Sequence, residues 1–357
     1  MKQGWEYKKF ETCINKAPKT KQVKANEYNS GTKYPIVSQE EQLISGYYDD
    51  ESYVFHIGSP IVIFGDHTRV LKYINFDFVV GADGVKILIP KPGLNAKFLL
   101  YYLQWYQIPN LGYSRHYKLL KELTIPLPPK STQLTIVSEL DKINELIRLK
   151  KEQLKDFDEL AQSIFHEMFG DAVENEKGWE VKRISNIAKY YNGVAHEKDV
   201  DKDGEFILVN AKFISSEGKI RKKTTIQHFP LFRNDVVMVL SDLPNGKSLA
   251  KCFLIDEDKK YSLNQRICCF RGFEGSAIFL KYVINRNPYL LLFNNGKSQT
   301  NLRKGDVEKM PIPLPPLPLQ QLFAHRIEQI EHQKAEVQKA IADLETLLAS
   351  RMQYWFE

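Results

Sequence analysis

A five-residue proline motif occurs twice in this chain and divides it into two copies of one unit. Ile125-Pro126-Leu127-Pro128-Pro129 returns 187 residues later as Ile312-Pro313-Leu314-Pro315-Pro316. The match continues beyond the prolines, because Gln133 and Gln320 keep the same offset. A repeat of this length indicates a duplicated domain rather than a solenoid of short repeats.

A second marker lies upstream of each proline motif. Gly4-Trp5-Glu6 returns 174 residues later as Gly178-Trp179-Glu180, so the second copy is 13 residues longer between its two markers. The chain has 357 residues, of which 43% are hydrophobic and 12% aromatic. That length and composition suffice for two folded cores and exclude a disordered chain.

No apolar run is long enough to span a bilayer, and the N-terminus lacks the apolar stretch of a signal peptide. We therefore expect a cytoplasmic protein. None of the four cysteines is spaced as Cys-x-x-Cys, and buried, reduced thiols are the expected state of Cys13, Cys252, Cys268 and Cys269.

The net charge of +6 is unevenly distributed. Residues 1–123 carry 16 basic and 12 acidic side chains, and residues 171–310 carry 24 and 18. Residues 124–170 and 311–357 are slightly acidic, with 6 basic against 8 acidic and 4 against 6. The excess of positive charge in the two longer segments suits a polyanionic partner, although a generic solvated surface explains it equally well.

Residues 1–123 and 171–310 are each predicted to form a mixed, strand-rich domain, because short β-branched or aromatic runs alternate with glycine and proline. Each also contains one helical pattern, at about 96–107 and about 277–284. The expected strands are 31–37, 53–57, 61–64, 76–80 and 85–89 in the first domain, and 206–209, 236–240, 252–255 and 267–270 in the second.

A heptad pattern follows each proline motif. Apolar residues recur at alternating steps of four and three from Ile136 to Met168 and from Phe323 to Trp355, with Lys150 and Lys334 as polar members of the seam. Two helices of about 39 residues would each be about 58 Å long at 1.5 Å per residue. Because a narrow apolar stripe needs a partner helix, we expect the two to pair antiparallel. Each lysine either fixes the register or extends its ammonium out of the seam.

The predicted fold is α+β: two globular, mixed domains joined by two long helices that form an antiparallel coiled coil with pseudo-two-fold symmetry. The expected boundaries are 1–123 for the first domain, 124–170 for the first proline segment and helix, 171–310 for the second domain and 311–357 for the second proline segment and helix.

Motifs of catalysis are absent from the sequence. It contains no glycine-rich phosphate loop, no Gly-x-Ser-x-Gly elbow, no His-Glu-x-x-His, no Cys/His cluster with metal-ligand spacing and no Asn/Asp-Pro-Pro-aromatic motif of an amino-methyltransferase. We expect no catalytic residue, metal or cofactor in this chain.

Two loop regions in each domain combine arginine, lysine, histidine, hydroxyl and amide side chains, which contact base edges and phosphates. They follow an apolar strand or precede the proline motif, and Gln265 and Arg266 add a further candidate segment. Ordinary polar turns are the alternative for each loop. The candidate DNA-binding residues are His67, Thr68, Arg69, Arg115, His116 and Lys118 in the first domain, and Lys247, Gln265, Arg266, Gln299, Asn301 and Arg303 in the second.

The chain resembles the specificity subunit of a type I restriction–modification system over essentially its whole length. The resemblance rests on the doubled Ile-Pro-Leu-Pro-Pro motif with its downstream glutamine, the long helices and the two Gly-Trp-Glu starts. The segments Gly65-Asp66-His67-Thr68-Arg69 and Gly81-Ala82-Asp83-Gly84 also resemble parts of target-recognition domains of that family.

The resemblance implies a non-catalytic DNA reader. Each target-recognition domain would bind one half of a split, asymmetric site in double-stranded DNA, and the helices would fix the spacing. Separate DNA adenine methyltransferase subunits, two of them, would dock on the chain and use S-adenosylmethionine, with motor-nuclease subunits joining for restriction. The compact domains leave a methylation-only complex open. Alternatives from other classes are a protein-interaction scaffold without nucleic acid and a self-contained DNA-modifying enzyme with an unrecognised motif.

Overall fold

The structure is a computed structural model that describes all of the chain except residues 1, 83, 113, 243–246 and 295–299. The chain divides into two compact units. The first comprises Met1–Glu152 with Gln338–Glu357, and the second comprises Gln153–Val337. Each unit therefore contains one globular part and a stretch of both long helices.

The first unit is strand-rich, as predicted. Its elements are β1 Glu6–Lys9, α1 Phe10–Cys13, β2 Ile14–Asn15, β3 Gln22–Val23, β4 Tyr34–Val37, β5 Gly46–Tyr48, β6 Val54–Phe55, β7 Ile61–Gly65, β8 Leu71–Ile74, β9 Phe78–Gly81, β10 Val85–Pro90, α2 Ala96–Tyr106, α3 Tyr117–Lys121, β11 Thr124–Leu127 and the start of α4 Lys130–Phe169, with 3-10 turns at Ala25–Glu27 and Glu51–Tyr53. One sheet has the order β2-β10-β7-β8, and a second, β3-β9-β4-β5, also pairs β6 with β9.

The second unit repeats this plan. Its elements are β12 Glu180–Arg183, α5 Ile184–Ile187, β13 Lys189–Asn192, β14 Phe206–Val209, α6 Ala211–Ser215, β15 Lys223–Thr224, β16 Val236–Val239, β17 Ser241–Asp242, β18 Cys252–Leu254, β19 Tyr261–Leu263, β20 Ile267–Arg271, α7 Ala277–Ile284, α8 Pro288–Leu291, β21 Thr300–Asn301, α9 Lys304–Glu308, β22 Pro311–Leu314 and the start of α10 Leu317–Phe356, with a 3-10 turn at Glu197–Asp199. Its main sheet, β13-β20-β16-β18, matches β2-β10-β7-β8 of the first unit.

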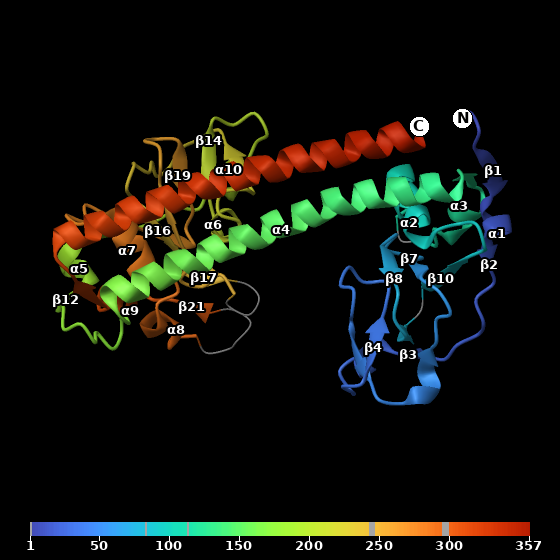
Figure 1. Ribbon diagram of the computed structural model, residues 1–357. Coiled ribbons are helices and arrows are strands. Elements are labelled where there is room, and N and C mark those ends of the chain that lie inside the picture. Colours follow the sequence, from blue (N-terminus) through green and yellow to red (C-terminus); the bar gives the residue numbers. More distant parts are fainter. Residues whose placement is uncertain (1, 83, 113, 243–246, 295–299) are drawn as a thin grey trace. The chain divides into compact units, whose positions relative to one another are not determined.

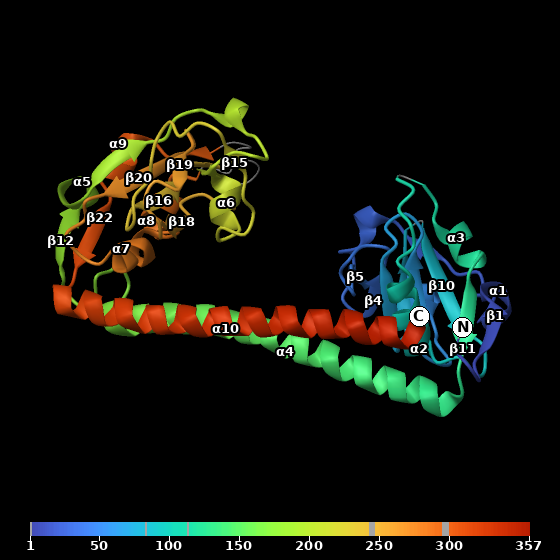
Figure 2. The ribbon, with the colours of Figure 1, turned by 90° about the horizontal axis from the view of Figure 1, so that it is seen from above.

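The two repeated sequence markers pair with each other inside each unit. Strand β1, which contains Glu6, runs antiparallel to β11, which contains Ile125-Pro126-Leu127 of the first proline motif, and Glu6 lies opposite Leu127. Strands β12 and β22, which lie side by side in Figure 2, repeat this register. Glu180 lies opposite Leu314. The prolines exclude a central strand, but a two-stranded ribbon leaves one edge of each strand free, so the missing N–H groups cost nothing there.

A buried glutamine fastens each proline segment to its domain. The side-chain amide of Gln133 donates to the carbonyl oxygens of Pro128 (2.9 Å) and Gly93 (2.8 Å), and its oxygen accepts the N–H of Asn95 (2.8 Å). Asn95 caps the N-terminus of α2 through Phe98. The long helix therefore begins at a fixed position against the first helix of the core.

Gln320 makes the corresponding contacts in the second unit. Its amide donates to the carbonyl oxygen of Pro315 (2.8 Å), and its oxygen accepts the N–H of Ser276 (3.1 Å), the cap of α7. Gln133 and Gln320 are 1% and 4% exposed. The glutamine repeat seen in the sequence is thus explained by a repeated hydrogen-bond arrangement.

The hydrophobic core of each unit includes the end of one long helix and the start of the other. In the first unit Phe98 of α2 packs against Phe356 of α10, with ring centroids 5.5 Å apart. In the second unit Phe279 of α7 packs against Phe169 of α4 at 4.9 Å. Phe169 and Phe356 occupy equivalent positions of the repeat. Phe169, at the end of α4, closes the core of the second domain, and Phe356, at the end of α10, closes that of the first.

The predicted heptad seam is confirmed. Every predicted seam position from Ile136 to Met168 and from Phe323 to Trp355 is buried or half-buried. Within the first unit Arg351 of α10 reaches Glu139 of α4, and within the second Lys334 reaches Asp158, which makes the pairing antiparallel. Figure 1 shows α4 and α10 running beside each other within each unit. Among the described residues, no helix has the length and apolar character needed to cross a membrane.

The seam lysine Lys334 is held by two carboxylates. Its Nζ lies 2.7 Å from Asp158 across the helix pair and 3.0 Å from Glu331 on its own helix. Burial alone would lower the pKa of Lys334, but the hydrogen bonds to the two carboxylates raise it above the ordinary lysine value. The ammonium is therefore paired across the seam, which favours one register over its neighbours.

Candidate nucleic-acid interface

Three segments of the first unit meet at Asp66, just after strand β7. The backbone N–H of Asp66 donates to the carbonyl of Gly84 (2.7 Å), and its own carbonyl accepts the N–H of His116 (2.8 Å). Its carboxylate accepts the N–H of Tyr117 (2.7 Å) at the start of α3. We call the described residues of 65–69, 82–84 and 111–118 the first loop cluster. Both candidate loops of the first domain lie in it.

The loop that follows β7 is held in place by Gln39, a residue that the sequence did not single out. Gln39 accepts the N–H of His67 on its side-chain oxygen (3.2 Å) and the hydroxyl of Thr68 on its backbone carbonyl (2.6 Å). Arg69 adopts a left-handed backbone with φ 61° and donates to the carbonyl of Ile108 (3.1 Å). These three predicted residues therefore have fixed positions.

A buried lysine holds the loop that contains Gln39. Lys72 of β8 is 5% exposed and donates to the carbonyl oxygens of Ser38 (2.9 Å) and Gln42, on either side of Gln39. Burial lowers the pKa of Lys72. Because this ammonium is enclosed by backbone carbonyls, its role is to hold the 38–42 loop, not to meet a ligand.

His116 has a different role from the one expected. It is fully buried, its Nδ1 lies 2.9 Å from the carbonyl of Asp66, and its Nε2 accepts the N–H of Leu111 (3.0 Å). Both ring nitrogens are therefore used inside the protein, and His116 positions the loop. Its neighbours Arg115 and Lys118 are exposed, so they are the cationic side chains that this loop presents to solvent.

The second unit brings its candidate segments together in the same way. The N–H of Leu240 donates to the carbonyl of Arg266 (2.9 Å), and the carbonyl of Leu240 accepts the N–H of Leu302 (2.8 Å). Strand β17 then pairs with β21, with Ser241 opposite Asn301. We call residues 240–242, 264–266 and 300–303 the second loop cluster. Leu240 occupies the position that Asp66 has in the first.

The predicted residues of the second unit are mostly presented to solvent. Gln265, Arg266, Asn301 and Arg303 are exposed in the second loop cluster, and Lys247 is exposed just after 243–246. The carbonyl of Lys247 accepts a hydrogen bond from the guanidinium of Arg286 (2.7 Å), which fixes its backbone. Gln299 lies outside the described residues.

Two buried polar atoms in the second loop cluster have no hydrogen-bond partner within the described part of the chain. They are Oγ of Ser241, which is 6% exposed, and Nδ2 of Asn264, which is fully buried. Buried polar groups normally find a partner. Both residues lie in candidate segments predicted from the sequence, although neither is among the candidate DNA-binding residues, because serine and asparagine are also ordinary turn residues.

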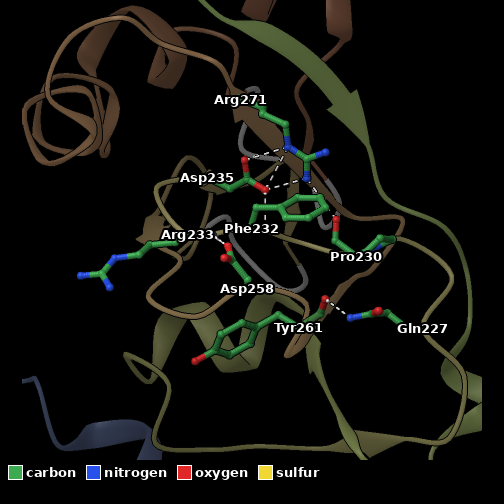
Figure 3. A network of polar contacts seen from close by, with 8 residues as sticks. All are labelled: Gln227, Pro230, Phe232, Arg233, Asp235, Asp258, Tyr261 and Arg271. Atoms are coloured by element: carbon green, nitrogen blue, oxygen red, sulfur yellow. Dashed lines mark hydrogen bonds and ion pairs between the residues drawn. The ribbon is translucent and has the colours of Figure 1, made fainter.

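A charged network lies at the end of strands β16 and β20 that is opposite the second loop cluster, and its contacts are made within the protein. Asp235, 2% exposed, accepts hydrogen bonds from Nε (2.9 Å) and Nη2 (2.6 Å) of Arg271 and from the N–H of Phe232 (2.8 Å). The guanidinium carbon lies 4.5 Å from the centre of the Phe232 ring. Figure 3 shows the side chain of Arg233 directed away from this network. Asp235 precedes β16, whereas the second loop cluster follows it.

No constellation for metal binding occurs among the described residues. They contain no group of three or more histidine, cysteine, aspartate or glutamate side chains arranged to hold a metal ion. All four cysteines are buried and free, as predicted, and burial raises the pKa of Cys252 and Cys269 above the ordinary thiol value.

The sequence matches one protein family twice. Residues 2–156 and again 176–346 match the family described as "Type I restriction modification DNA specificity domain". The chain belongs to this family. Members are the DNA-recognition component of type I restriction–modification systems and not the catalytic one. The two matched ranges agree with the duplication inferred from the proline motif.

Curated relatives carry the same description. The chain is 24% identical to the type I restriction enzyme MjaIX specificity subunit of Methanocaldococcus jannaschii over 307 residues, which are 74% of this chain and 69% of that protein. It is 24% identical to the EcoR124I/EcoR124II specificity subunit of Escherichia coli over 198 residues, 50% of this chain and 46% of that protein.

Solved structures share the fold. The type I restriction–modification S subunit from M. genitalium matches with a TM-score of 0.58 and 14% identity, over 99% of this chain and 96% of that one. A structure described as showing complex assembly and conformational transition of the type I system matches with a TM-score of 0.56 and 15% identity, over 100% and 98%. The family therefore accounts for the two strand-rich domains and the long helices.

Proposed function

We propose that the chain reads a bipartite, asymmetric site in double-stranded DNA, with one half-site for each loop cluster. The observation that carries this proposal is the repeated arrangement of the two clusters. Asp66 and Leu240 join the same three segments through the same backbone hydrogen bonds, whereas the exposed side chains differ. A common scaffold with different polar side chains suits two unlike DNA sequences.

Exposed cations and amides supply the contacts in this proposal. Arg115 and Lys118 serve the first half-site, with His67, Thr68 and Arg69 on the neighbouring loop. For the second half-site the candidates are Lys247, Gln265, Arg266, Asn301 and Arg303, with Gln299 retained from the sequence prediction. Arginine reads guanine and glutamine or asparagine reads adenine through paired hydrogen bonds, and lysine suits phosphate. His116 is assigned the positioning of its loop.

The domains expected from the sequence, 1–123 and 171–310, are the target-recognition domains in this proposal, and 124–170 and 311–357 hold the half-sites at a fixed spacing. Half-sites read on one face of a duplex are separated by about 34 Å or a multiple of it. Inserting four residues, about one helical turn, into both long helices should change the gap between the half-sites. An unchanged gap in the methylated sequence would reject this spacing role.

We also propose that the chain recruits two DNA adenine methyltransferase subunits in the cytoplasm, and motor-nuclease subunits when it serves restriction. Leucines on α4 that lie outside the seam support a protein partner. Leu134, Leu146 and Leu149 are 48%, 47% and 45% exposed. The transferred methyl group and its cofactor, S-adenosylmethionine, would belong to the partner subunits.

Single substitutions test the DNA assignment. Arg115→Ala should relax recognition of one half-site and Arg303→Ala that of the other, while Lys19→Ala and Lys198→Ala, exposed cations outside both clusters, should leave recognition unchanged. The readout is methylation mapping in cells together with DNA binding at several salt concentrations. Uniform weakening with a smaller salt dependence would assign the arginines to phosphate contact. Salt-independent or absent DNA binding by the complex would favour the scaffold without nucleic acid.

A further inference from the structure

An open groove lies beside the two-stranded ribbon of the first unit. Its volume is about 460 Å³. Strand β1, helix α1, the segment between β10 and α2, and the proline segment form its walls. The side chains of interest are Lys8, Thr12, Lys91, Leu94 and Leu127. None of them belongs to the first loop cluster.

The second unit has a groove of about 540 Å³ in the same place. Strand β12, helix α5, the start of β13, the segment between β20 and α7, the proline segment and the start of α10 form its walls. Its side chains include Lys182, Asn186, Phe273, Glu274 and Leu314. None of them belongs to the second loop cluster.

Strand register shows that the two grooves are equivalent. Lys8 lies opposite Ile125 and Lys182 opposite Ile312, the same residue of the proline motif. On the facing wall, the backbone that leads into the helix cap Asn95 matches the backbone that leads into the cap Ser276, and each cap is bound by the repeated glutamine. The duplication has therefore kept the frame of this groove, with Lys8 matching Lys182 and Leu127 matching Leu314, while the loop clusters diverged.

The grooves also share their charge. Each contains two lysines and one glutamate: Lys8, Lys91 and Glu6 in the first, and Lys182, Lys189 and Glu274 in the second. Lys8 forms an ion pair with Glu6 at 2.8 Å. Lys182 forms one with Glu180 at 3.2 Å, although Glu180 does not line the second groove. In the described part of the chain, Lys91 and Lys189 form no ion pair with a carboxylate. Each groove thus presents an uncommitted cation beside apolar leucine.

We propose that the two grooves bind the same short acidic and apolar segment of two identical partner subunits, one segment in each groove. This inference rests on the proposed recruitment of two methyltransferase subunits. A surface that reads DNA should differ between two unlike half-sites, whereas these grooves share their frame and the equivalent pairs Lys8/Lys182 and Leu127/Leu314. The two lysines and the leucines in each lining suit an acidic, apolar peptide by charge complementarity.

The test uses the full chain co-purified with the methyltransferase subunit of its own system. Lys8→Glu with Lys91→Glu reverses the charge of the first groove, and Lys182→Glu with Lys189→Glu that of the second. Native mass spectrometry should find two partner copies on the unaltered chain, one copy on either variant and none on the combined variant. DNA affinity of the chain without its partner should stay unchanged in all of them.

Charge-reversed controls on the same units are Lys19→Glu with Lys33→Glu and Lys198→Glu with Lys202→Glu, exposed lysines outside both grooves. They should retain two partner copies, and a thermal melt of every variant checks folding. Two copies retained by the combined groove variant would overturn the inference. The inference would also be overturned if the groove variants bound DNA more weakly and with a smaller salt dependence, because the grooves would then contact DNA phosphates. If the unaltered chain itself binds no methyltransferase, the proposed function fails instead.

Discussion

Replacing the buried glutamines by leucine should destabilise the two units by different amounts. Leucine is close to glutamine in size but removes every hydrogen bond of the side-chain amide. Gln133 makes three such bonds, to Pro128, Gly93 and Asn95, and Gln320 makes two, to Pro315 and Ser276. The first substitution therefore removes one more hydrogen bond to the backbone than the second.

The expected magnitudes follow from the number of bonds lost. At a net contribution of about 1 kcal/mol per hydrogen bond, Gln133→Leu should lower the free energy of unfolding of the first unit by about 3 kcal/mol. Gln320→Leu should lower that of the second unit by about 2 kcal/mol on the same basis. Gln162→Leu, at an exposed position of α4, is a control that should change stability little.

Hydrogen exchange followed by mass spectrometry measures each unit separately. Protection of the amides near Asn95 should fall in Gln133→Leu, and protection near Ser276 should fall in Gln320→Leu. Urea unfolding of the whole chain gives the summed loss. Equal losses, a larger loss for Gln320→Leu, or unchanged protection at both helix caps would refute the role assigned to these glutamines.

A glutamate at position 133 adds a pH test. It keeps the oxygen that accepts the N–H of Asn95 but places a second oxygen against the carbonyls of Pro128 and Gly93. Burial and those carbonyls should raise its folded pKa above the ordinary value of about 4.3. Relative to the unaltered chain, Gln133→Glu should therefore be least destabilised below that value and lose stability as pH rises through the folded pKa. A destabilisation that does not vary with pH would contradict the placement of the second carboxylate oxygen against the carbonyls of Pro128 and Gly93.

Three further predictions concern other contacts. Arg351 lowers the pKa of Glu139 from 4.5, so thermal stability should fall as pH drops below about 4.5, and Glu139→Gln should reduce that dependence. Asp235→Ile should cost about 3 kcal/mol or more because it leaves Arg271 unpaired, whereas replacing both by isoleucine should cost less in urea unfolding. Gly193→Ala would place its Cβ 2.1 Å from the carbonyl oxygen of Asn264, and should weaken recognition of the second half-site alone by methylation mapping.

Periodic features of the fold could be predicted from the sequence because their causes are local. The heptad spacing from Ile136 to Met168 specifies α4, and the helical pattern predicted at about 277–284 matches α7. The prolines correctly excluded a central strand. The ribbons β1–β11 and β12–β22 were not predicted, because each joins segments more than a hundred residues apart and only the assembled domain places them side by side.

Site residues were harder to predict because side-chain composition does not reveal what a side chain contacts. His116 and Arg115 are neighbours with equal promise in the sequence, yet Asp66 and Leu111 bind both nitrogens of His116 and leave Arg115 exposed. Gln39 lies in no recognisable motif. It holds the loop after β7 only because the fold brings His67 and Thr68 next to it. Such roles depend on contacts between distant segments, which no local pattern encodes.

The duplication itself separates the shared parts of this molecule from the specific ones. Gln133 and Gln320 keep both residue type and contacts, and Phe169 and Phe356 close the two cores in the same way. At the centre of the loop clusters, by contrast, Asp66 is replaced by Leu240 although the backbone hydrogen bonds are the same. One copy thus serves as the control for the other. A residue preserved in both belongs to the scaffold or to a partner common to both units, and a residue that differs on a preserved backbone is where the two proposed DNA specificities should be sought.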